Sequence, residues 1–382
     1  MLKILEVLFW ASLFIIVYSY TVYPLLLFLF VKLFGKPVKQ DSGYLPTVGV
    51  LVPAHNEEKV IRKKIENILA INYPPDKLSV WVGSDCSADE TDAIVEGYAD
   101  SRVHLWRAPS RGGKTGILNR LAPLIDAEVI MFTDANTMHR PDCLTAVVRN
   151  FADKRVGAVA GHIRHAMAGD DEIGEEVYRG FESRQKFLEG TLHSTISAFG
   201  GFYTVRKSLF RPIPDNAYSN DDVLIPMNVI RQGYRVIFEP EAVSEEEMTG
   251  DFKGEYRRRI RIGAGNFQAF SWLLDFIIPF RGWPSFCLIS HKFTRWFSPI
   301  FLATAAMSCA VLFFRSPADI YRMLFATGTV IVTIGLLHKV IHLRISQHVF
   351  YFISMNVALL MGLLRFLSGI KSAVWSRTER VA

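Results

Sequence analysis

The chain has 382 residues, of which 50% are hydrophobic and 28 are phenylalanine, an apolar content that is high for a soluble protein. Its formal net charge is +6, and much of the excess lysine and arginine lies beside apolar runs. This placement indicates contact with anionic lipid and argues against nucleic acid as a partner. The cysteines are scattered without a CxxC pair, so we expect free thiols in a reducing cytoplasm rather than disulfides or a zinc site.

The first apolar segment is Ile4–Phe34. At ~1.5 Å per helical residue it is long enough to cross a hydrocarbon core of about 30 Å. It is too long for a signal-peptide core and no small-x-small cleavage site follows it, so residues 1–40 are predicted to be an uncleaved membrane anchor. Lys32, Lys36 and Lys39 flank its far end, which places the following residues in the cytoplasm by the positive-inside rule.

Residues 46–265 have the composition of a globular domain. Short apolar runs that suit buried strands alternate there with segments of helical apolar spacing. The strand candidates are Val48–Val52, Leu78–Val82, Val103–Trp106 and Val129–Phe132. Strands that alternate with helices predict an α/β fold with a parallel, doubly wound sheet.

Further apolar runs of near spanning length close the chain within residues 296–370: Phe297–Phe314, Tyr321–Leu337 and Val349–Leu367. Before them, Trp272–Ile289 is apolar but interrupted by charges and prolines, so residues 266–295 are predicted to form an amphipathic segment at the membrane interface. One anchor and three spans would put the basic tail, residues 371–382, outside the cell, against the charge rule. Either one run is re-entrant or Trp272–Ile289 also spans.

The strand candidate Val129–Phe132 is followed at once by Asp134 and Asn136. In open α/β sheets, ligands bind at the carboxyl ends of the strands. A carboxylate and an amide two residues apart can direct two oxygens the same way, which suits a hard divalent cation such as Mg²⁺ or Mn²⁺. The alternative, that Asp134 caps a helix that begins near Pro141, fits this segment about equally well.

Polar or charged side chains follow each of the four strand candidates named above. They are Asn56 and Glu57, Asp85 and Asp89, Arg111 and Lys114, and Asp134 and Asn136. Any of them alone could cap a helix, and Asp89 looks like such a cap. Capping does not require acidic and basic groups in turn, so the series predicts one binding site at one edge of the sheet.

The loop Ser110–Gly116 combines Gly112 and Gly113, which let backbone approach an anion closely, with the cationic Lys114 at a helix start. Residues 108–115 also match the phosphate-binding P-loop pattern, except that alanine replaces its first glycine. Because of this match, a P-loop ATPase coupled to membrane segments stays as an alternative. The position of the loop argues against it, since a P-loop normally follows the first strand of its sheet and this loop follows the third strand candidate.

Later segments carry further candidate groups. Gly200 and Gly201 precede an aromatic strand candidate, either because backbone approaches a ligand there or because the chain simply turns. Asp221 and Asp222 begin a helix, whose dipole stabilises a carboxylate. A carboxylate that acts as general base for a hydroxyl must be ionised at neutral pH, and a helix cap explains only one of these two aspartates.

Arginines are concentrated within Tyr256–Gly265, just before the membrane segments. Arg258 and Arg261 would share one face of a helix, as would Arg257 and Arg261. Lipid headgroups are one possible set of partners for them. A diphosphate is the other, because a guanidinium group matches phosphate oxygens in shape.

Several motifs follow one another in order between about residues 46 and 265: PAHNEE, SDCSADET, GGKTGILN, FTDAN, GGFYTVR, NDDVLIPMNVIRQGYRVIFEPEA and RRRIRIGAG. Together they resemble the family 2 inverting glycosyltransferases, in the membrane-anchored branch that includes cellulose, chitin, hyaluronan and poly-N-acetylglucosamine synthases. The resemblance implies a Rossmann-like GT-A fold flanked by transmembrane helices, and a nucleotide-sugar donor, most often of UDP.

By the resemblance, the first strand ends bind the donor. Asn56 and Glu57 would lie near the nucleoside, Asp85 would contact the uracil, and Lys114 would lie near the phosphates.

The resemblance also implies a metal site and a base. Asp134 would open the family's DXD metal motif, in which Asn136 replaces the second aspartate and removes one negative charge. Asp222 would be the catalytic base, as the last residue of a TED-like motif that here begins with Asn220 and Asp221.

The last motif corresponds to the family's QRxRW. Arg258, Arg259 and Arg261 would stand where the family has its glutamine and two arginines, and Ile262 replaces the tryptophan. That tryptophan helps to form the acceptor floor in processive synthases, so its loss favours transfer of one or a few sugars. The Gly200–Gly201 pair is expected to flank the acceptor.

We therefore expect a multi-pass enzyme of the cell inner membrane with a cytoplasmic catalytic domain. It would transfer a sugar, with inversion, from a nucleotide-sugar to a glycan or lipid-linked acceptor, with a divalent cation as cofactor. Partner subunits of a polysaccharide export system are a further expectation. Two alternatives remain beside it, the P-loop ATPase and a non-catalytic nucleotide-sugar-binding partner of a synthase.

Overall fold

The computed structural model describes residues 1–165, 173–246, 252–338, 340 and 343–370. By its internal contacts the chain forms two compact units. We call residues 1–29, 168–182 and 255–369 the membrane unit, and residues 30–167, 183–254 and 370–382 the sheet unit. Each is described by itself.

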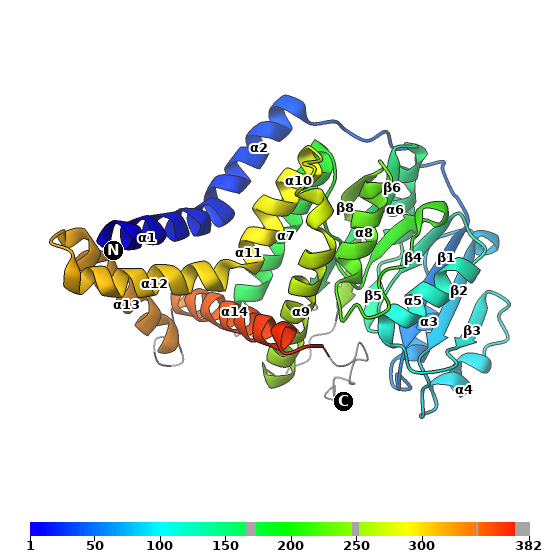
Figure 1. Cartoon of the computed structure of the whole chain (residues 1–382). Coiled ribbons are helices and arrows are strands. Elements are labelled where there is room, and N and C mark those ends of the chain that lie inside the picture. The colour runs from blue at the N-terminus through cyan, green and yellow to red at the C-terminus, as the bar shows by residue number, and fades with distance from the viewer. Residues whose placement is uncertain (166–172, 247–251, 339, 341–342, 371–382) are drawn as a thin grey trace. The chain divides into compact units, whose positions relative to one another are not determined.

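The sheet unit is built on one eight-stranded sheet of order β3-β2-β1-β4-β7-β6-β8-β5. Its first half consists of four parallel strands that lie side by side in Figure 1: β1 (Val48–Ala54), β2 (Leu78–Ser84), β3 (Val103–Arg107) and β4 (Val129–Phe132). Every residue of β1 and β4 is buried, as their uninterrupted apolar runs require. This half is the predicted parallel sheet.

The second half of the sheet is mixed, which the sequence did not predict. It comprises β5 (Thr137–His139), β6 (Val156–His165), β7 (Tyr203–Arg206) and β8 (Arg235–Glu246). Strand β7 runs antiparallel to β4 and β6, β6 is parallel to β8, and β5 is antiparallel to β8. An antiparallel β7 beside β4 brings the loop that precedes β7 to the carboxyl end of β4.

Helices cover both faces of the sheet. On one face α3 (Ile61–Leu69), α4 (Thr91–Glu96) and α6 (Cys143–Val148) enclose the main apolar core with the valines of β1 and β2. On the other face α5 (Gly113–Leu121) packs on β1 and β2, and α8 (Asp221–Arg231) packs on β6 and β8. Short 3₁₀ turns complete this unit at Pro75–Lys77, Ala122–Leu124, Arg149–Ala152 and Lys207–Leu209.

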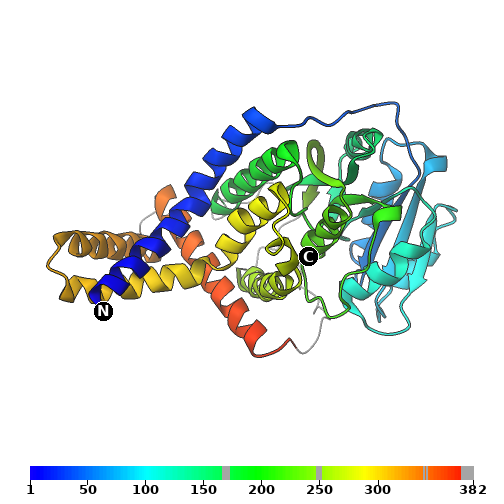
Figure 2. The same ribbon diagram turned by 45° about the horizontal axis from the view of Figure 1, so that its top comes forward.

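The described residues contain four helical segments that are long and apolar enough to cross a membrane, and all but residues 30–34 of these segments belong to the membrane unit. The first, residues 2–34, consists of α1 (Leu2–Val17), a π-helical turn (Tyr18–Val22) and α2 (Tyr23–Phe34). The others are α12 (Ser298–Arg315), α13 (Asp319–Leu336) and α14 (Arg344–Leu367), which coincide with the predicted runs. Helix α1 packs along α12, as Figures 1 and 2 both show.

The segment Trp272–Ile289 is not one of these candidate spans. It follows α9 (Phe252–Trp272) and consists of a 3₁₀ turn (Leu274–Phe276), α10 (Trp283–Cys287) and the start of a π-helical turn (Leu288–Phe293) that leads to α11 (Thr294–Trp296). Its prolines break any continuous helix, so its interfacial position stays a prediction. The basic tail lies outside the described residues.

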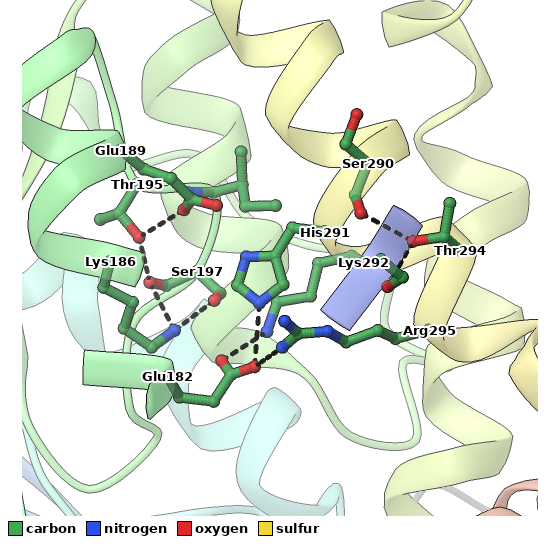
Figure 3. A network of polar contacts seen from close by, with 12 residues as sticks. Glu182, Lys186, Glu189, Thr195, Ser197, Ser290, His291, Lys292, Thr294 and Arg295 are labelled. Carbon is green, nitrogen blue, oxygen red and sulfur yellow. Dashed lines mark hydrogen bonds and ion pairs between the residues drawn. The ribbon is translucent and has the colours of Figure 1, made fainter. Parts of the chain in front are cut away.

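Helix α7 (Ile173–Leu192) carries buried charges along one side (Figure 3). Within the membrane unit, the Glu182 carboxylate lies 2.9 Å from His291 Nε2 and 3.3 Å from Lys292 Nζ, and it also pairs with Arg295. Within the sheet unit, Lys186 Nζ donates a hydrogen bond of 3.0 Å to the carbonyl of Ser197. Glu182 and Lys186 are only 5% and 1% exposed, so both networks are part of the interior.

Candidate active site

Lys114 is the centre of the candidate site in the sheet unit. It lies in the first turn of α5, where the loop after β3 delivers it. Its Nζ lies 2.8 Å from Asp134 Oδ1 and 3.2 Å from Asp221 Oδ2, and it donates a 3.1 Å hydrogen bond to the carbonyl of Gly200. Residues from three distant segments thus converge on one ammonium group, and of these Asp134 belongs to the series of strand-end groups.

The charge on Lys114 is stabilised by these aspartates. Burial by itself would lower the pKa of Lys114, but Asp134, Asp221 and then Asp222 raise it above its ordinary value. The side chain is 22% exposed, so it remains reachable from solvent. The site therefore holds a permanent cation next to carboxylates, which is suited to the phosphate oxygens of a ligand.

The two aspartates at the start of α8 lie in different surroundings. Asp221 is buried, and its Oδ2 accepts a 2.9 Å hydrogen bond from the hydroxyl of Tyr203, which stacks on Phe132. Asp222 is half-buried. Asn220, the residue before Asp221, adopts a left-handed conformation with φ of 70°, which asparagine tolerates better than most residues. This turn directs the start of α8 to the loop before β7.

The two glycines before β7 have different functions in the fold. A Cβ atom on Gly200 would lie 3.7 Å from Lys114 Nζ and 3.9 Å from Asp222 Cγ, which places Gly200 against the candidate site. A Cβ atom on Gly201 would come within 2.5 Å of Thr137 Oγ1, so Gly201 is required by packing. Packing accounts for Gly201, while the approach of a ligand at Gly200 stays a prediction.

Asp85 holds the loop after β3. Its carboxylate is fully buried and accepts hydrogen bonds from the amides of Gly112 and Gly113 at 2.7 and 3.0 Å, and from Arg111 Nε at 3.0 Å. The amides that a P-loop would direct at phosphate therefore meet a protein carboxylate. This geometry argues against the P-loop alternative, and the anion that the glycines admit is Asp85 itself.

His55 completes this arrangement, although the sequence did not single it out. Arg111 Nη1 donates to His55 Nε2 at 2.6 Å, so the other ring nitrogen, Nδ1, donates to the Asp85 carbonyl at 2.9 Å. Burial and the Arg111 charge lower the pKa of His55, which keeps it neutral. Its only sequence signal is its place in the PAHNEE motif.

The loops after β1 and β2 are joined to each other. Asn56, with φ of 56°, accepts a 2.8 Å hydrogen bond from the Ala88 amide, and the Glu57 amide donates to Thr91 Oγ1 at 2.8 Å. Asp89 accepts from the Thr91 amide at 3.0 Å, although the N-cap residue of α4 is Glu90 rather than the predicted Asp89. Contacts of Asn56, Glu57 and Asp85 with a nucleoside stay predictions.

Asp134 and Asn136 provide an oxygen-rich pair for a cation. Asp134 is 36% exposed, and Asn136 donates through its Nδ2 to Glu246 at 3.3 Å, which leaves its amide oxygen as an acceptor. No group of three or more His, Cys, Asp or Glu side chains among the described residues is arranged to hold a metal ion. A carboxylate and an amide oxygen fit Mg²⁺ or Mn²⁺ that takes its other ligands from phosphate and water.

The predicted diphosphate-binding arginines, Arg258, Arg259 and Arg261, lie on α9 in the membrane unit. Within that unit Arg259 Nη1 donates a 3.1 Å hydrogen bond to the hydroxyl of Tyr351, and its guanidinium group lies over the ring of that tyrosine. Their role at a diphosphate stays a prediction.

The parallel half-sheet with its mixed second half and the helices on both faces has the architecture of the GT-A fold. The same fold occurs in the mannosyltransferase PcManGT from Pyrobaculum calidifontis, solved in complex with GDP-Man and Mn²⁺. That structure matches with a TM-score of 0.73 and 23% identity over 96% of this chain and 99% of that one.

Residues 49–211 match the family model described as Glycosyl transferase family 2, so this part of the chain is a family 2 glycosyltransferase domain. A β-monoglucosyldiacylglycerol synthase of Trichormus variabilis is 38% identical over 138 residues, 35% of this chain and 29% of the relative. A poly-β-1,6-N-acetyl-D-glucosamine synthase of Staphylococcus aureus is 25% identical over 233 residues, 59% of this chain and 55% of the relative. The chain thus spans between about a third and about half of the length of these curated relatives.

Proposed function

We propose that this protein is a membrane-bound inverting glycosyltransferase that moves a sugar from a nucleotide-sugar, foremost a UDP-sugar, to a hydroxyl of a lipid-linked or glycan acceptor. The observation that carries the proposal is the meeting of Lys114 with Asp134, Asp221 and Gly200 in a family 2 domain.

The donor diphosphate is expected to replace one aspartate as a partner of Lys114. Phosphate oxygens are strong acceptors for an ammonium group, and the raised pKa keeps Lys114 charged at any physiological pH. Asp134 and Asn136 would hold Mg²⁺ or Mn²⁺, which would supply Lewis-acid stabilisation of the leaving diphosphate. Arg258, Arg259 and Arg261 are proposed to bind the same diphosphate.

Asp222 is the proposed general base. Asp221 is the poorer candidate because it is buried and already accepts hydrogen bonds from Tyr203 and Lys114. Asp222 would remove the proton of the acceptor hydroxyl while that oxygen attacks the anomeric carbon from the face opposite the diphosphate. A donor with an α-linked sugar would then give a β-glycoside.

The acceptor is proposed to be a lipid or a lipid-linked glycan. One relative is named for the synthesis of a glucosyl lipid and another for a polysaccharide, and this chain has helices long enough to reside in the membrane with such acceptors. Ile262 in the place of tryptophan supports transfer of one or a few sugars rather than long processive synthesis.

The experiment that tests the proposal is a donor panel. Purified full-length protein in detergent–lipid micelles is incubated with radiolabelled UDP-sugars and GDP-sugars and with Mg²⁺ or Mn²⁺. Products are then extracted into lipid, polymer and water fractions. We expect label from one UDP-sugar in the lipid fraction, with a β-linkage in the NMR spectrum of the product. Absence of metal-dependent transfer from every donor would refute the proposal.

A further inference from the structure

Lys64 is a lysine that is fully buried in the apolar core of the sheet unit. It lies on α3, on the same face as Ile61, Ile65 and Ile68, and its exposed fraction is 0%. Its neighbour Lys63 is exposed. An ammonium group in such surroundings is costly unless hydrogen bonds compensate for the lost water. The buried Lys64 therefore requires hydrogen-bond partners within the protein.

The contacts of Lys64 are directed at the segment that carries the candidate metal ligands. Its Nζ donates to Thr133 Oγ1 at 2.9 Å, to the carbonyl of Thr137, and to His139 Nε2 at 3.0 Å. Thr133 directly precedes Asp134, and Thr137 directly follows Asn136. One side chain thus holds both ends of the four-residue loop between β4 and β5.

The same helix holds this segment at a second point, one turn further along. Asn67 donates through Nδ2 to the His139 carbonyl at 2.9 Å and accepts from the His139 amide at 2.8 Å. The ring of His139 is fixed from its other side by Ser244 Oγ, 2.6 Å from Nδ1. The lysine contact is therefore made to a rigid partner.

We propose that Lys64 is a positioning residue that holds the 133–137 loop in the conformation in which Asp134 and Asn136 together accept a divalent cation. The inference rests on the proposed function, because it assigns to these two residues the cation of the nucleotide-sugar complex. Lys64 touches neither the cation nor the donor and acts through the backbone and side chains of the loop. Partners behind metal ligands typically change metal affinity by about 10- to 100-fold when they are removed.

If Lys64 acted through its charge instead, its removal would change the affinity for the cation in the opposite direction. A positive charge behind Asp134 would repel a cation, so its removal would tighten cation binding. Burial lowers the pKa of Lys64 to about 7, so its charge is reduced at pH 8, while the neutral amine still donates two hydrogen bonds to the loop. Measurements at pH 8 therefore test the positioning role.

The test is a titration of Mn²⁺ into the full chain in detergent, in the presence of UDP, followed by electron paramagnetic resonance. Lys64→Met is compared with two matched lysine variants, Lys63→Met on the exposed face of α3 and Lys186→Met, which is equally buried but contacts the Ser197 carbonyl. We expect the Mn²⁺ dissociation constant to rise about 10-fold or more in Lys64→Met and to stay within about 2-fold in the other two.

Thr133→Val keeps the side-chain volume and removes one of the lysine's acceptors, so it decides the question if Lys64→Met does not fold. Its Mn²⁺ dissociation constant is expected to rise by a smaller factor, about 3-fold to 10-fold. Unchanged or tighter Mn²⁺ binding in both Lys64→Met and Thr133→Val would overturn the inference, as would an equal loss in Lys186→Met. A wild-type protein that binds no Mn²⁺ with either UDP or GDP would instead refute the proposed function.

Discussion

Lys114 Nζ and Asp134 Oδ1 lie 2.8 Å apart, so the predicted phosphate-binding lysine and the predicted metal-binding aspartate are paired with each other. Under the proposed function both groups would serve the donor diphosphate, and in this structure they neutralise one another. Binding of donor and cation would then separate them, with the diphosphate as the new partner of Lys114 and the cation as the new partner of Asp134.

Lys114→Met should lower kcat/KM for the nucleotide-sugar by about 10²-fold or more, because a charge-assisted contact to phosphate is lost. The same variant should bind Mn²⁺ more tightly than the wild type in the absence of nucleotide, since Asp134 has lost its competing partner. Steady-state kinetics and a nucleotide-free Mn²⁺ titration measure the two effects. Lys154→Met, at an exposed position, is the control. Unchanged kinetics in Lys114→Met would contradict this assignment.

The two glycines before β7 should respond differently to alanine. Gly201→Ala forces a Cβ atom to within 2.5 Å of Thr137 Oγ1 and should lower the free energy of unfolding by about 1–3 kcal/mol. Gly200→Ala meets only ordinary contact distances and should leave stability nearly unchanged while it alters the acceptor KM. Thermal unfolding in detergent measures the stability of both variants, and steady-state kinetics measure their KM for the acceptor. Equal destabilisation by both variants would contradict the assignment of Gly200 to the site.

Glu182 should be a strong stabilising position of the membrane unit. Removal of its charge in Glu182→Gln leaves the buried Arg295 and the partly buried Lys292 without this carboxylate, and loss of one partner of a buried ion pair typically costs about 3–5 kcal/mol. Glu245→Gln, whose ion pair with Arg140 is about half exposed, should cost less than about 1 kcal/mol. The measurement is the unfolding midpoint of each variant, and similar midpoints would be inconsistent with the network in Figure 3.

Lys64 should make stability depend on pH above neutrality. Burial lowers the pKa of Lys64 to about 7 in the folded protein, whereas the unfolded chain has the ordinary lysine value. Between these values the unfolded state binds more protons, so a rise in pH favours the folded state by up to about 1.4 kcal/mol per pH unit. From pH 7 to pH 9 the wild type should gain stability relative to Lys64→Met. A constant difference over this range would show that the folded pKa of Lys64 is not lowered.

Local sequence patterns predicted the strands whose own residues form a continuous apolar run. The buried strands β1 and β4 are continuous apolar runs, and of the groups predicted at the strand ends Asp134 meets Lys114, while Asp85 binds the loop that carries that lysine. Strands β6 and β8 were not predicted because glycines, Pro240 and charged residues interrupt their apolar patterns. Their register, with shifts near Gly157 and Gly161, depends on partners that are distant in sequence.

The candidate site, too, was predictable in its residues but not in their contacts. The identity of the charged residues was visible in the motifs, but the mutual pairing of Lys114 with Asp134, and of Asp85 with the Gly112 and Gly113 amides, is set by tertiary structure. Lys64 gave one signal that could have been used, namely its position three residues after Ile61 on the apolar face of α3. Which polar atoms would meet it there could not be inferred from sequence.

The central claim is that Asp222 is the base for sugar transfer, and Asp222→Asn tests it most directly. We expect the variant to bind UDP and Mn²⁺ with nearly wild-type affinity while its turnover falls by about 10²- to 10⁴-fold. Asp126→Asn, at an exposed position before the other end of β4, should keep full turnover. Turnover in Asp222→Asn that stays close to the wild-type rate would contradict the account.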